Sequence, residues 1–309
     1  MNEVSLTNKT AINFLKMIND KWRNQFYYDA LNKHAKDKVV LDMGSGTGIL
    51  SFYALAAGAK FVYAIERNGY AADLTYKVLK SKFDTSRFAV INCDFWKSDL
   101  DIIKHPIDIL VSETVGPGLF DHGMLTTWQC IKPYLSPNAI SIPDTLSFDL
   151  WVWQKQLDAD FLTTLEPEQL SDKLSIDACL DQDFAEALIS QNPSDVKKMR
   201  WININHIQSK PDYVYTDKVT YTMNNLPDWW CGNTTEPKIL FNVDIDTPAS
   251  VAIINKISFE SRTLFIKDAL YMPWRFNPVF NLDSAGKYNM VYNNFDPTGN
   301  RWGQEWKIL

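Results

Sequence analysis

The stretch Val39–Leu50, VVLDMGSGTGIL, joins an apolar run that ends at Asp42 to three glycines at alternating positions. This pattern predicts a buried β-strand, a tight turn at Gly44, Gly46 and Gly48, and a helix directly after the turn. Because glycine has no Cβ, a turn of this kind lets the backbone approach a ligand closely. The spacing GxGxG also differs from the GxGxxG that is typical of dinucleotide-binding folds.

A second apolar run, FVYAI, ends in Glu66, at the distance where an acidic residue accepts hydrogen bonds from a ribose hydroxyl. The glycine turn and this glutamate together predict a nucleoside site. An ordinary strand–helix turn, or a nicotinamide or flavin site, is the alternative. After the third run, Asp94 and Phe95 reach the same sheet edge, where they contact an adenine or simply pack in the loop.

The order of apolar runs predicts the fold class. Between Lys38 and Ile142, four runs alternate with segments of helix length: KVVLDM, FVYAI, RFAVINC and IDILVS. This alternation predicts an α/β domain with a doubly wound, Rossmann-like parallel sheet. After Pro143 the period changes to two, in the runs TLSFDLWVW, KVTYTM, ILFNVDID and SVAIINKISF. We therefore expect an antiparallel, β-barrel-like domain there.

Two helical segments complete the predicted organisation. Thr7–Leu31 has apolar residues at steps of three and four along one stripe, so we expect one N-terminal helix. Its opposite stripe carries Met17, Asp20, Arg23 and Tyr27, which would be solvated on an isolated helix. An acidic insert with helical spacing reads as an arm. The predicted parts are the helix at 1–35, the α/β domain at 36–143, and the β domain at 144–309 with its arm at about 156–198.

The amino-acid composition disfavours several classes of protein function. The 309 residues carry a net charge of −6, which disfavours broad nucleic-acid binding and suits a basic peptide or a small cation better. The start MNEVSLTNKT lacks a signal-peptide pattern, and no long apolar run predicts a membrane span, so we expect a cytoplasmic protein. The four cysteines form no CxxC pair, which is typical of reduced thiols, and we expect no metal.

Several segments resemble the protein arginine methyltransferases: FLKMINDKWRNQFYYDAL, VVLDMGSGTGILSFYALAAGAKFVYAIE, LVSETVGPGLFDHGML and SIPDTL, in this order. The first segment is most similar to the subgroup whose chains carry tandem methyltransferase modules. The resemblance implies S-adenosylmethionine as the methyl donor and S-adenosylhomocysteine as the product. It covers roughly residues 12 to 150.

The resemblance also implies roles for single residues. Arg23 matches the arginine that pairs with the donor's carboxylate, and such guanidinium–carboxylate pairs are strong where water is excluded. Met17 and Asp20 match residues beside the acceptor pocket, which turns the polar stripe of the helix toward the donor site as a lid. Pro143 matches the proline at the domain boundary. The positions that match nucleoside-binding residues are Asp42, Gly44, Gly46, Gly48 and Glu66.

The acceptor loop departs from the family. Its members hold the target guanidinium between two glutamates, which concentrate the positive charge away from the attacking nitrogen. Glu113 matches the first glutamate, but His122 stands at the second, and neutral imidazole supplies no negative charge. Asp121 is adjacent and fills the site if the loop is shifted by one residue. In the family's threonine–histidine–tryptophan loop, Arg301 replaces the histidine before Trp302.

Three functions remain open from the sequence. The first is methyl transfer to arginine or another guanidine, in a peptide or a small molecule, with Glu113 and either Asp121 or His122. The second is transfer to a non-arginine acceptor with His122 as general base. The third is a non-catalytic scaffold that binds the donor. Family members pair through an arm, so the resemblance also implies a homodimer.

Overall fold

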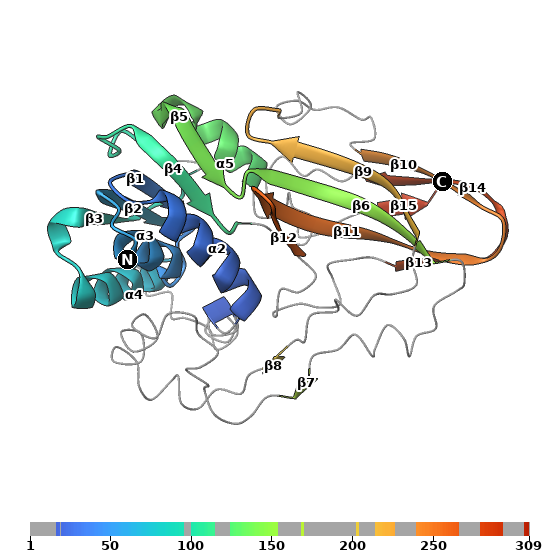
Figure 1. The fold of residues 1–309 in the computed structure, drawn as a ribbon, viewed down its shortest axis with the longest axis horizontal. Coiled ribbons are helices and arrows are strands. Elements are labelled where there is room, and N and C mark those ends of the chain that lie inside the picture. Colours follow the sequence, from blue (N-terminus) through green and yellow to red (C-terminus); the bar gives the residue numbers. More distant parts are fainter. Residues whose placement is uncertain are drawn as a thin grey trace. The chain divides into compact units, whose positions relative to one another are not determined.

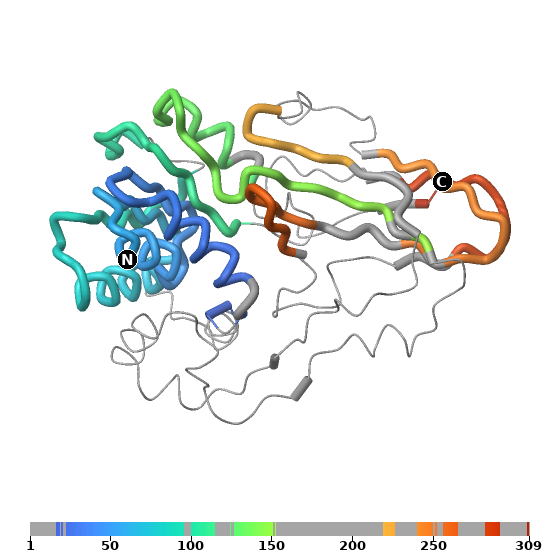
Figure 2. The backbone as a smooth tube through the Cα atoms, viewed as in Figure 1, coloured from blue at the N-terminus to red at the C-terminus, as the bar shows by residue number. Residues whose placement is uncertain are grey.

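The structure is a computed structural model, and it describes the greater part of the chain. The described residues are 17–18, 20–95, 100–114, 124–153, 168–169, 202–203, 214–225, 239–265, 279–292 and 306–308. Figure 2 follows the backbone from blue at the N-terminus to red at the C-terminus. They form two compact units, and one of the points at which the chain passes from the first to the second lies between Asp144 and Thr145.

The first unit is built on a five-stranded sheet in the order β3-β2-β1-β4-β5, with every neighbouring pair parallel (Figure 1). This confirms the predicted doubly wound α/β fold. The strands are β1 (Val39–Met43), β2 (Phe61–Glu66), β3 (Phe88–Asn92), β4 (Ile107–Ser112) and β5 (Leu135–Ile142).

Helices shield the central strand of this sheet from solvent. Every residue of β1 is buried, as is typical of a parallel strand covered on both faces. Trp128 is fully buried in α5, and its indole Nε1 donates a hydrogen bond to Ser141 Oγ at 2.7 Å. The helical elements are α2 (Lys21–His34), α3 (Ile49–Ala56), α4 (Gly69–Lys82), α5 (Met124–Ile131) and the 3-10 turns η1 (Thr85–Arg87) and η2 (Lys132–Tyr134).

The N-terminal helix differs from the prediction of one continuous helix over Thr7–Leu31. The described Met17 and Ile18 are helical, but Asp20 has extended backbone, and α2 begins after it. The Asp20 side chain accepts a hydrogen bond from the backbone N–H of Arg23 at 3.0 Å, which is the contact of an N-cap. The apolar period continues through this cap, so periodicity alone gave no sign of the break.

The second unit consists of antiparallel sheets, as the period of two predicted. One sheet has the order β12-β11-β6-β9, with β13 also paired to β11, and the other has the order β10-β14-β15. In β10, the buried residues Phe241, Val243 and Ile245 alternate with exposed ones. The strands are β6 (Thr145–Trp153), β9 (Val214–Thr222), β10 (Ile239–Ile245), β11 (Ala249–Phe259), β12 (Arg262–Phe265), β13 (Val279–Leu282), β14 (Gly286–Tyr292) and β15 (Trp306–Ile308).

The boundary between the two units contains a cis peptide bond, and the predicted arm contains a short pair of strands. The Ile142–Pro143 peptide bond is cis, at the place where the chain leaves the first unit. Within the predicted arm, Glu168–Gln169 forms β7, which pairs antiparallel with β8, Ile202–Asn203. The helical stretch predicted for the arm lies outside the described residues. Among the described residues, no helix is both long enough and apolar enough to cross a membrane.

Candidate functional site

The candidate site lies where the strand order of the parallel sheet reverses direction. The chain runs outward from β1 to β2 and β3, then returns to β4 on the other side of β1. In open α/β sheets, ligands bind at the carboxyl ends of the strands beside this switch point. Asp42, Glu66 and Glu113 come from the carboxyl ends of β1, β2 and β4, so all three lie at this edge.

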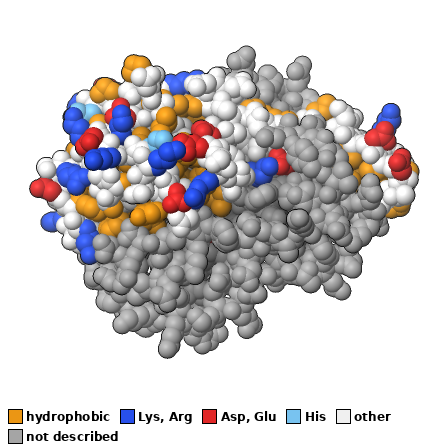
Figure 3. Space-filling model, viewed as in Figure 1, with side chains coloured by type: hydrophobic (Ala, Val, Ile, Leu, Met, Phe, Trp, Pro, Cys, Tyr) orange, Lys and Arg blue, Asp and Glu red, His pale blue; other side chains and the backbone are white. Residues whose placement is uncertain are grey.

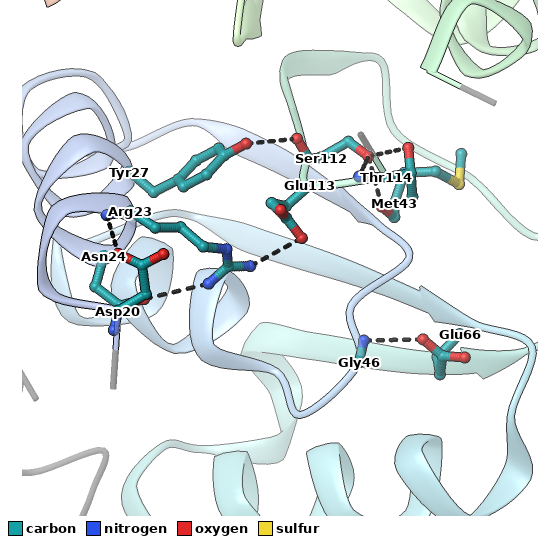
Figure 4. Close-up of polar contacts among 10 residues, drawn as sticks. All are labelled: Asp20, Arg23, Asn24, Tyr27, Met43, Gly46, Glu66, Ser112, Glu113 and Thr114. Atoms are coloured by element: carbon teal, nitrogen blue, oxygen red, sulfur yellow. Dashed lines mark hydrogen bonds and ion pairs between the residues drawn. The ribbon is translucent and has the colours of Figure 1, made fainter. Parts of the chain in front are cut away.

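Arg23 and Glu113 form an ion pair in this place. Arg23 Nη2 lies 3.2 Å from Glu113 Oε2, and the side chains are only 3% and 8% exposed. Arginine is seldom buried so completely unless it is paired. Figure 4 shows the Arg23 side chain extending from α2 toward Glu113, and its Nη1 also donates to Asn24 Oδ1 at 3.2 Å. The residue predicted for the donor and the residue predicted for the acceptor are therefore in direct contact.

Tyr27 fixes the helix that carries Arg23. Its phenolic hydroxyl donates to the backbone carbonyl of Ser112 at 3.0 Å, and its side chain is fully buried. Arg23 lies one helical turn before Tyr27, so the two side chains share a face of α2, and the Arg23 guanidinium carbon is 5.6 Å from the Tyr27 ring centroid. Since Glu113 directly follows Ser112, this anchor sets the separation between Arg23 and Glu113.

Glu66 holds the glycine loop to the end of β2. Its Oε2 accepts from Gly46 N at 2.9 Å, and its Oε1 accepts from Asn68 N at 2.7 Å. Each carboxylate oxygen has two lone-pair directions, so these bonds leave acceptor capacity for a hydroxyl. The predicted ribose contact is compatible with this geometry, and it remains a prediction.

Asp42 caps α3 from the end of β1. Gly48 provides no side-chain cap for this helix, whereas Asp42 Oδ2 accepts from Ser51 N at 2.9 Å and Ser51 Oγ at 2.7 Å. Within the described part of the chain, the buried Oδ1 has no hydrogen-bond partner. Burial raises the pKa of Asp42 to about 7, the Ser51 bonds oppose this, and the nearby Glu66 carboxylate adds to it.

Two of the glycines are required by packing inside the protein. Gly44 has φ +77° and Gly48 has φ +82°, both in the left-handed region that favours glycine. A Cβ on Gly44 would lie 2.5 Å from Thr114 Cγ2, and a Cβ on Gly48 would lie 2.7 Å from Thr75 Cγ2. Thr75 Oγ1 also donates to Gly46 O at 2.9 Å, which ties α4 to the loop.

The remaining predicted residues divide into two groups. Asp94 and Phe95 are half-buried and follow β3 at the same edge of the sheet, while Met17 is half-buried and Asp20 is buried before α2. Their binding roles remain predictions. The residues that lie outside the described part of the chain are Asp121, His122, Arg301 and Trp302.

Comparisons of sequence point to one family. No family model matches the chain. It is 38% identical over 139 residues to protein arginine N-methyltransferase 1 of Chlamydomonas reinhardtii, and 38% identical over 125 residues to protein arginine N-methyltransferase 8-B of Danio rerio. Over these residues the chain is similar to the protein arginine methyltransferases. The matches cover 44% and 40% of the chain but only 39% and 28% of these arginine methyltransferases, so it spans less than half their length.

Solved arginine methyltransferase structures share the fold over nearly the whole chain. A crystal structure described as PRMT6 gives a TM-score of 0.66 at 15% identity and covers 98% of this chain and 100% of its own. The Trypanosoma brucei PRMT1 enzyme–prozyme complex with AdoHcy gives 0.55 at 18% identity, with 96% of each chain covered. The similarity to the tandem-module subgroup remains a prediction.

The sequence alone indicates no role for three residues that contribute to the site geometry, Tyr27, Ser112 and Thr114. Tyr27 stood on the polar stripe of the helix, which was the only signal for it. Ser112 and Thr114 flank Glu113, and single hydroxyl residues form no pattern of spacing. Their partners are backbone groups and one another, which only the fold brings together.

The raised pKa of Asp42 predicts a pH-dependent stability of the donor-free protein. The folded pKa of about 7 exceeds the ordinary aspartate pKa of 3.8, so the folded protein keeps a proton that the unfolded chain releases between these values. The contribution of this group to stability is therefore full below pH 4 and is lost as the pH rises through 7. The neutral Asp42→Asn should remove this loss. Its free energy of unfolding, relative to that of wild type, should therefore rise by about 2 to 3 kcal/mol from pH 5 to pH 8.

Urea unfolding of Asp42→Asn and of wild type, at about pH 5 and at about pH 8, measures this difference in unfolding free energy. Asp73→Asn is the control, because it alters an exposed carboxylate on α4 and should show no comparable trend. A constant difference between Asp42→Asn and wild type across the range would contradict the prediction.

Proposed function

We propose that this chain is an S-adenosylmethionine-dependent methyltransferase that methylates arginine or another guanidine in a protein or small molecule. The observation that carries the proposal is the buried ion pair between Arg23 and Glu113 at the switch point of the sheet. The names of the related proteins favour arginine over the other acceptors. They also disfavour the alternatives of a His122-dependent acceptor and of a non-catalytic scaffold.

The residues on the donor side fit S-adenosylmethionine. Arg23 suits its carboxylate, and Glu66 retains acceptor capacity for ribose hydroxyls. The buried Asp42 Oδ1 is an acceptor for which the described residues supply no donor, and an ammonium group is the kind of partner that would satisfy it. When bound, the donor supplies an electrophilic methyl group. The solved Trypanosoma brucei PRMT1 complex, which is described as containing AdoHcy, is consistent with S-adenosylmethionine as the donor.

On the acceptor side, Glu113 would bind and polarise a guanidinium. A guanidinium stays charged at neutral pH, and its nitrogen lone pairs are delocalised. A buried carboxylate attracts the positive charge to the nitrogens it contacts, which leaves the distal nitrogen richer in electrons and directs it at the methyl group. A carboxylate accepts up to four hydrogen bonds, so Glu113 can contact Arg23 and an acceptor together.

The surface charge on the face drawn in Figure 3 does not fit binding to a polyanion. On the face drawn in Figure 3, acidic and basic side chains of the first unit are interspersed. Binding to nucleic acid through phosphate attraction needs clustered lysine and arginine. A peptide or small molecule that presents one guanidinium to Glu113 fits better, and nucleic acid is not the proposed partner.

The direct test is incubation with labelled donor and a panel of arginine-containing peptides, free arginine and cell extract, followed by mass spectrometry. We expect methyl groups on arginine side chains. Matched peptides with lysine in place of arginine should stay unmodified. Methylation only of other acceptors would overturn the arginine assignment, and binding of S-adenosylhomocysteine without any transfer would support a scaffold instead.

Glu113→Gln should separate acceptor chemistry from donor binding. Glutamine has the same shape and still accepts a hydrogen bond, but it lacks the charge that polarises the acceptor. We expect transfer to fall by about 100-fold or more, the loss typical of removing one preorganised group from a transition state. The affinity for S-adenosylhomocysteine, measured by calorimetry, should not weaken, because Arg23 then keeps its charge for the donor carboxylate.

Arg23→Lys is the matched variant for the other half of the site. Lysine keeps the charge but not the planar fork, so donor-product affinity should fall together with activity.

If Glu113→Gln transfers methyl groups at the wild-type rate, Glu113 does not belong to the acceptor site.

A cytoplasmic homodimer, paired through the arm at about 156–198, completes the proposal. The resemblance to the family is its basis, and the Trypanosoma brucei relative is described as a heterotetrameric complex. Light scattering should give twice the chain mass for the full chain, and deletion of the arm should abolish pairing. A single species of 35.5 kDa at all concentrations would contradict it.

A further inference from the structure

Ser112 connects the end of β4 to the start of the glycine loop. Met43 and Ser112 form the last register pair between β1 and β4. Ser112 Oγ donates to the Met43 carbonyl at 2.7 Å, and the Ser112 side chain is fully buried. This bond satisfies a backbone acceptor at the point where the sheet ends and the glycine loop begins.

Thr114 completes the hydrogen bonding of Ser112. The two hydroxyl oxygens lie 2.9 Å apart, and Thr114 N donates to Ser112 Oγ at 3.3 Å. A hydroxyl has one hydrogen to donate and two lone pairs to accept. Since the Ser112 hydrogen is used on Met43, the Thr114 hydroxyl must donate to Ser112. The Ser112–Thr114 hydroxyl pair therefore has a fixed direction and leaves Ser112 fully satisfied (Figure 4).

The methyl group of Thr114 packs against the glycine loop itself. Thr114 Cγ2 occupies the space into which any side chain on Gly44 would project, at 2.5 Å from an added Cβ. Gly44 N in turn donates to Ile65 O at 2.9 Å, so the loop is held at the end of β2 as well. Thr114 thus touches the donor loop with its methyl group and Ser112 with its hydroxyl.

Glu113 lies between these two anchored residues. On one side, Ser112 is held by the Met43 carbonyl and by the Tyr27 hydroxyl. On the other side, Thr114 is held by Ser112 and by contact with Gly44. The backbone that carries the Glu113 carboxylate therefore takes its position from the glycine loop.

We propose that Ser112 and Thr114 are positioning residues that align the Glu113 carboxylate with the donor loop. The proposal rests on the proposed function, since it assumes that Glu113 receives the acceptor. It assigns the alignment of Glu113 to the hydroxyl of Thr114, while the methyl group of the same side chain contacts the glycine loop. A shift of about 1 Å in a positioned group costs up to 100-fold in rate, so a small loosening of this link is measurable.

Thr114→Val tests the hydroxyl, because valine keeps the methyl group and the shape but cannot donate to Ser112. We expect kcat for an arginine peptide to fall about tenfold, with the Kd for S-adenosylhomocysteine changed less than about threefold. Thr114→Ser keeps the hydroxyl and should retain kcat to within about threefold. Thr263→Val is the matched control, since Thr263 forms a similar but exposed pair with Ser258 at 3.0 Å in the second unit.

A purely structural role gives a different result. If Thr114→Val lowers the melting temperature but leaves kcat and KM unchanged at a temperature where it is folded, the positioning role is overturned. The same holds if Thr114→Ser loses as much activity as Thr114→Val, because the retained hydroxyl then has no effect.

A double-mutant cycle between Gly44→Ala and Thr114→Ser tests the methyl contact without any transfer assay. The strain of alanine at positive φ is common to both backgrounds and cancels in the cycle. We expect Gly44→Ala to weaken S-adenosylhomocysteine binding about tenfold more in the presence of Thr114 than in the Thr114→Ser background. Equal losses would overturn the link between the two loops. If the wild-type chain methylates nothing, the proposed function fails, and the link is then decided by this cycle alone.

Discussion

Arg23 is a buried cation, and the arrangement of the candidate site follows from the need to pair it. Its side chain is 3% exposed, and its Nη2 lies 3.2 Å from Glu113 Oε2. Leaving either partner alone in this environment would cost several kcal/mol, because a buried unpaired charge loses its solvation. Tyr27 must therefore hold α2 against Ser112, and β4 must end where Glu113 can reach Arg23. The same constraint brings a helix, a strand end and the glycine loop to one edge of the sheet.

The atoms of the glycine loop that pack inside the protein belong to the same residues that are proposed to contact the donor. At Gly44 and Gly48 the space beside the backbone is taken by Thr114 and Thr75, so these positions exclude side chains even before a ligand is considered. Asp42 acts similarly, since its Oδ2 caps α3 while its Oδ1 has no partner among the described residues. A loop held this firmly by its own protein costs little further ordering when a donor binds.

The sequence predicted the sheet well, because buried parallel strands are apolar runs and the runs matched β1 to β4 closely. It failed at Asp20, where an N-cap starts a new helix although the apolar period continues unchanged. Within the site, Arg23 and Glu113 were named from separate segments, and the fold brings them together, while their binding roles remain predictions. The hydroxyl pair of Ser112 and Thr114 was missed because its contacts are tertiary and have no repeat.

Sharing one guanidinium between two anions links the two halves of the proposed reaction. Arg23 offers several N–H donors in a rigid plane, of which Nη2 faces Glu113 and Nη1 faces Asn24. A donor carboxylate that pairs with this guanidinium draws positive charge away from Glu113, and the glutamate then carries more of its charge toward an incoming guanidinium. Under the proposed function, the donor would thereby prepare the acceptor site electrostatically, and the Ser112–Thr114 hydroxyl pair would hold Glu113 in place. Such a redistribution of charge would need little movement of Glu113, which is the condition under which a preorganised carboxylate is most effective.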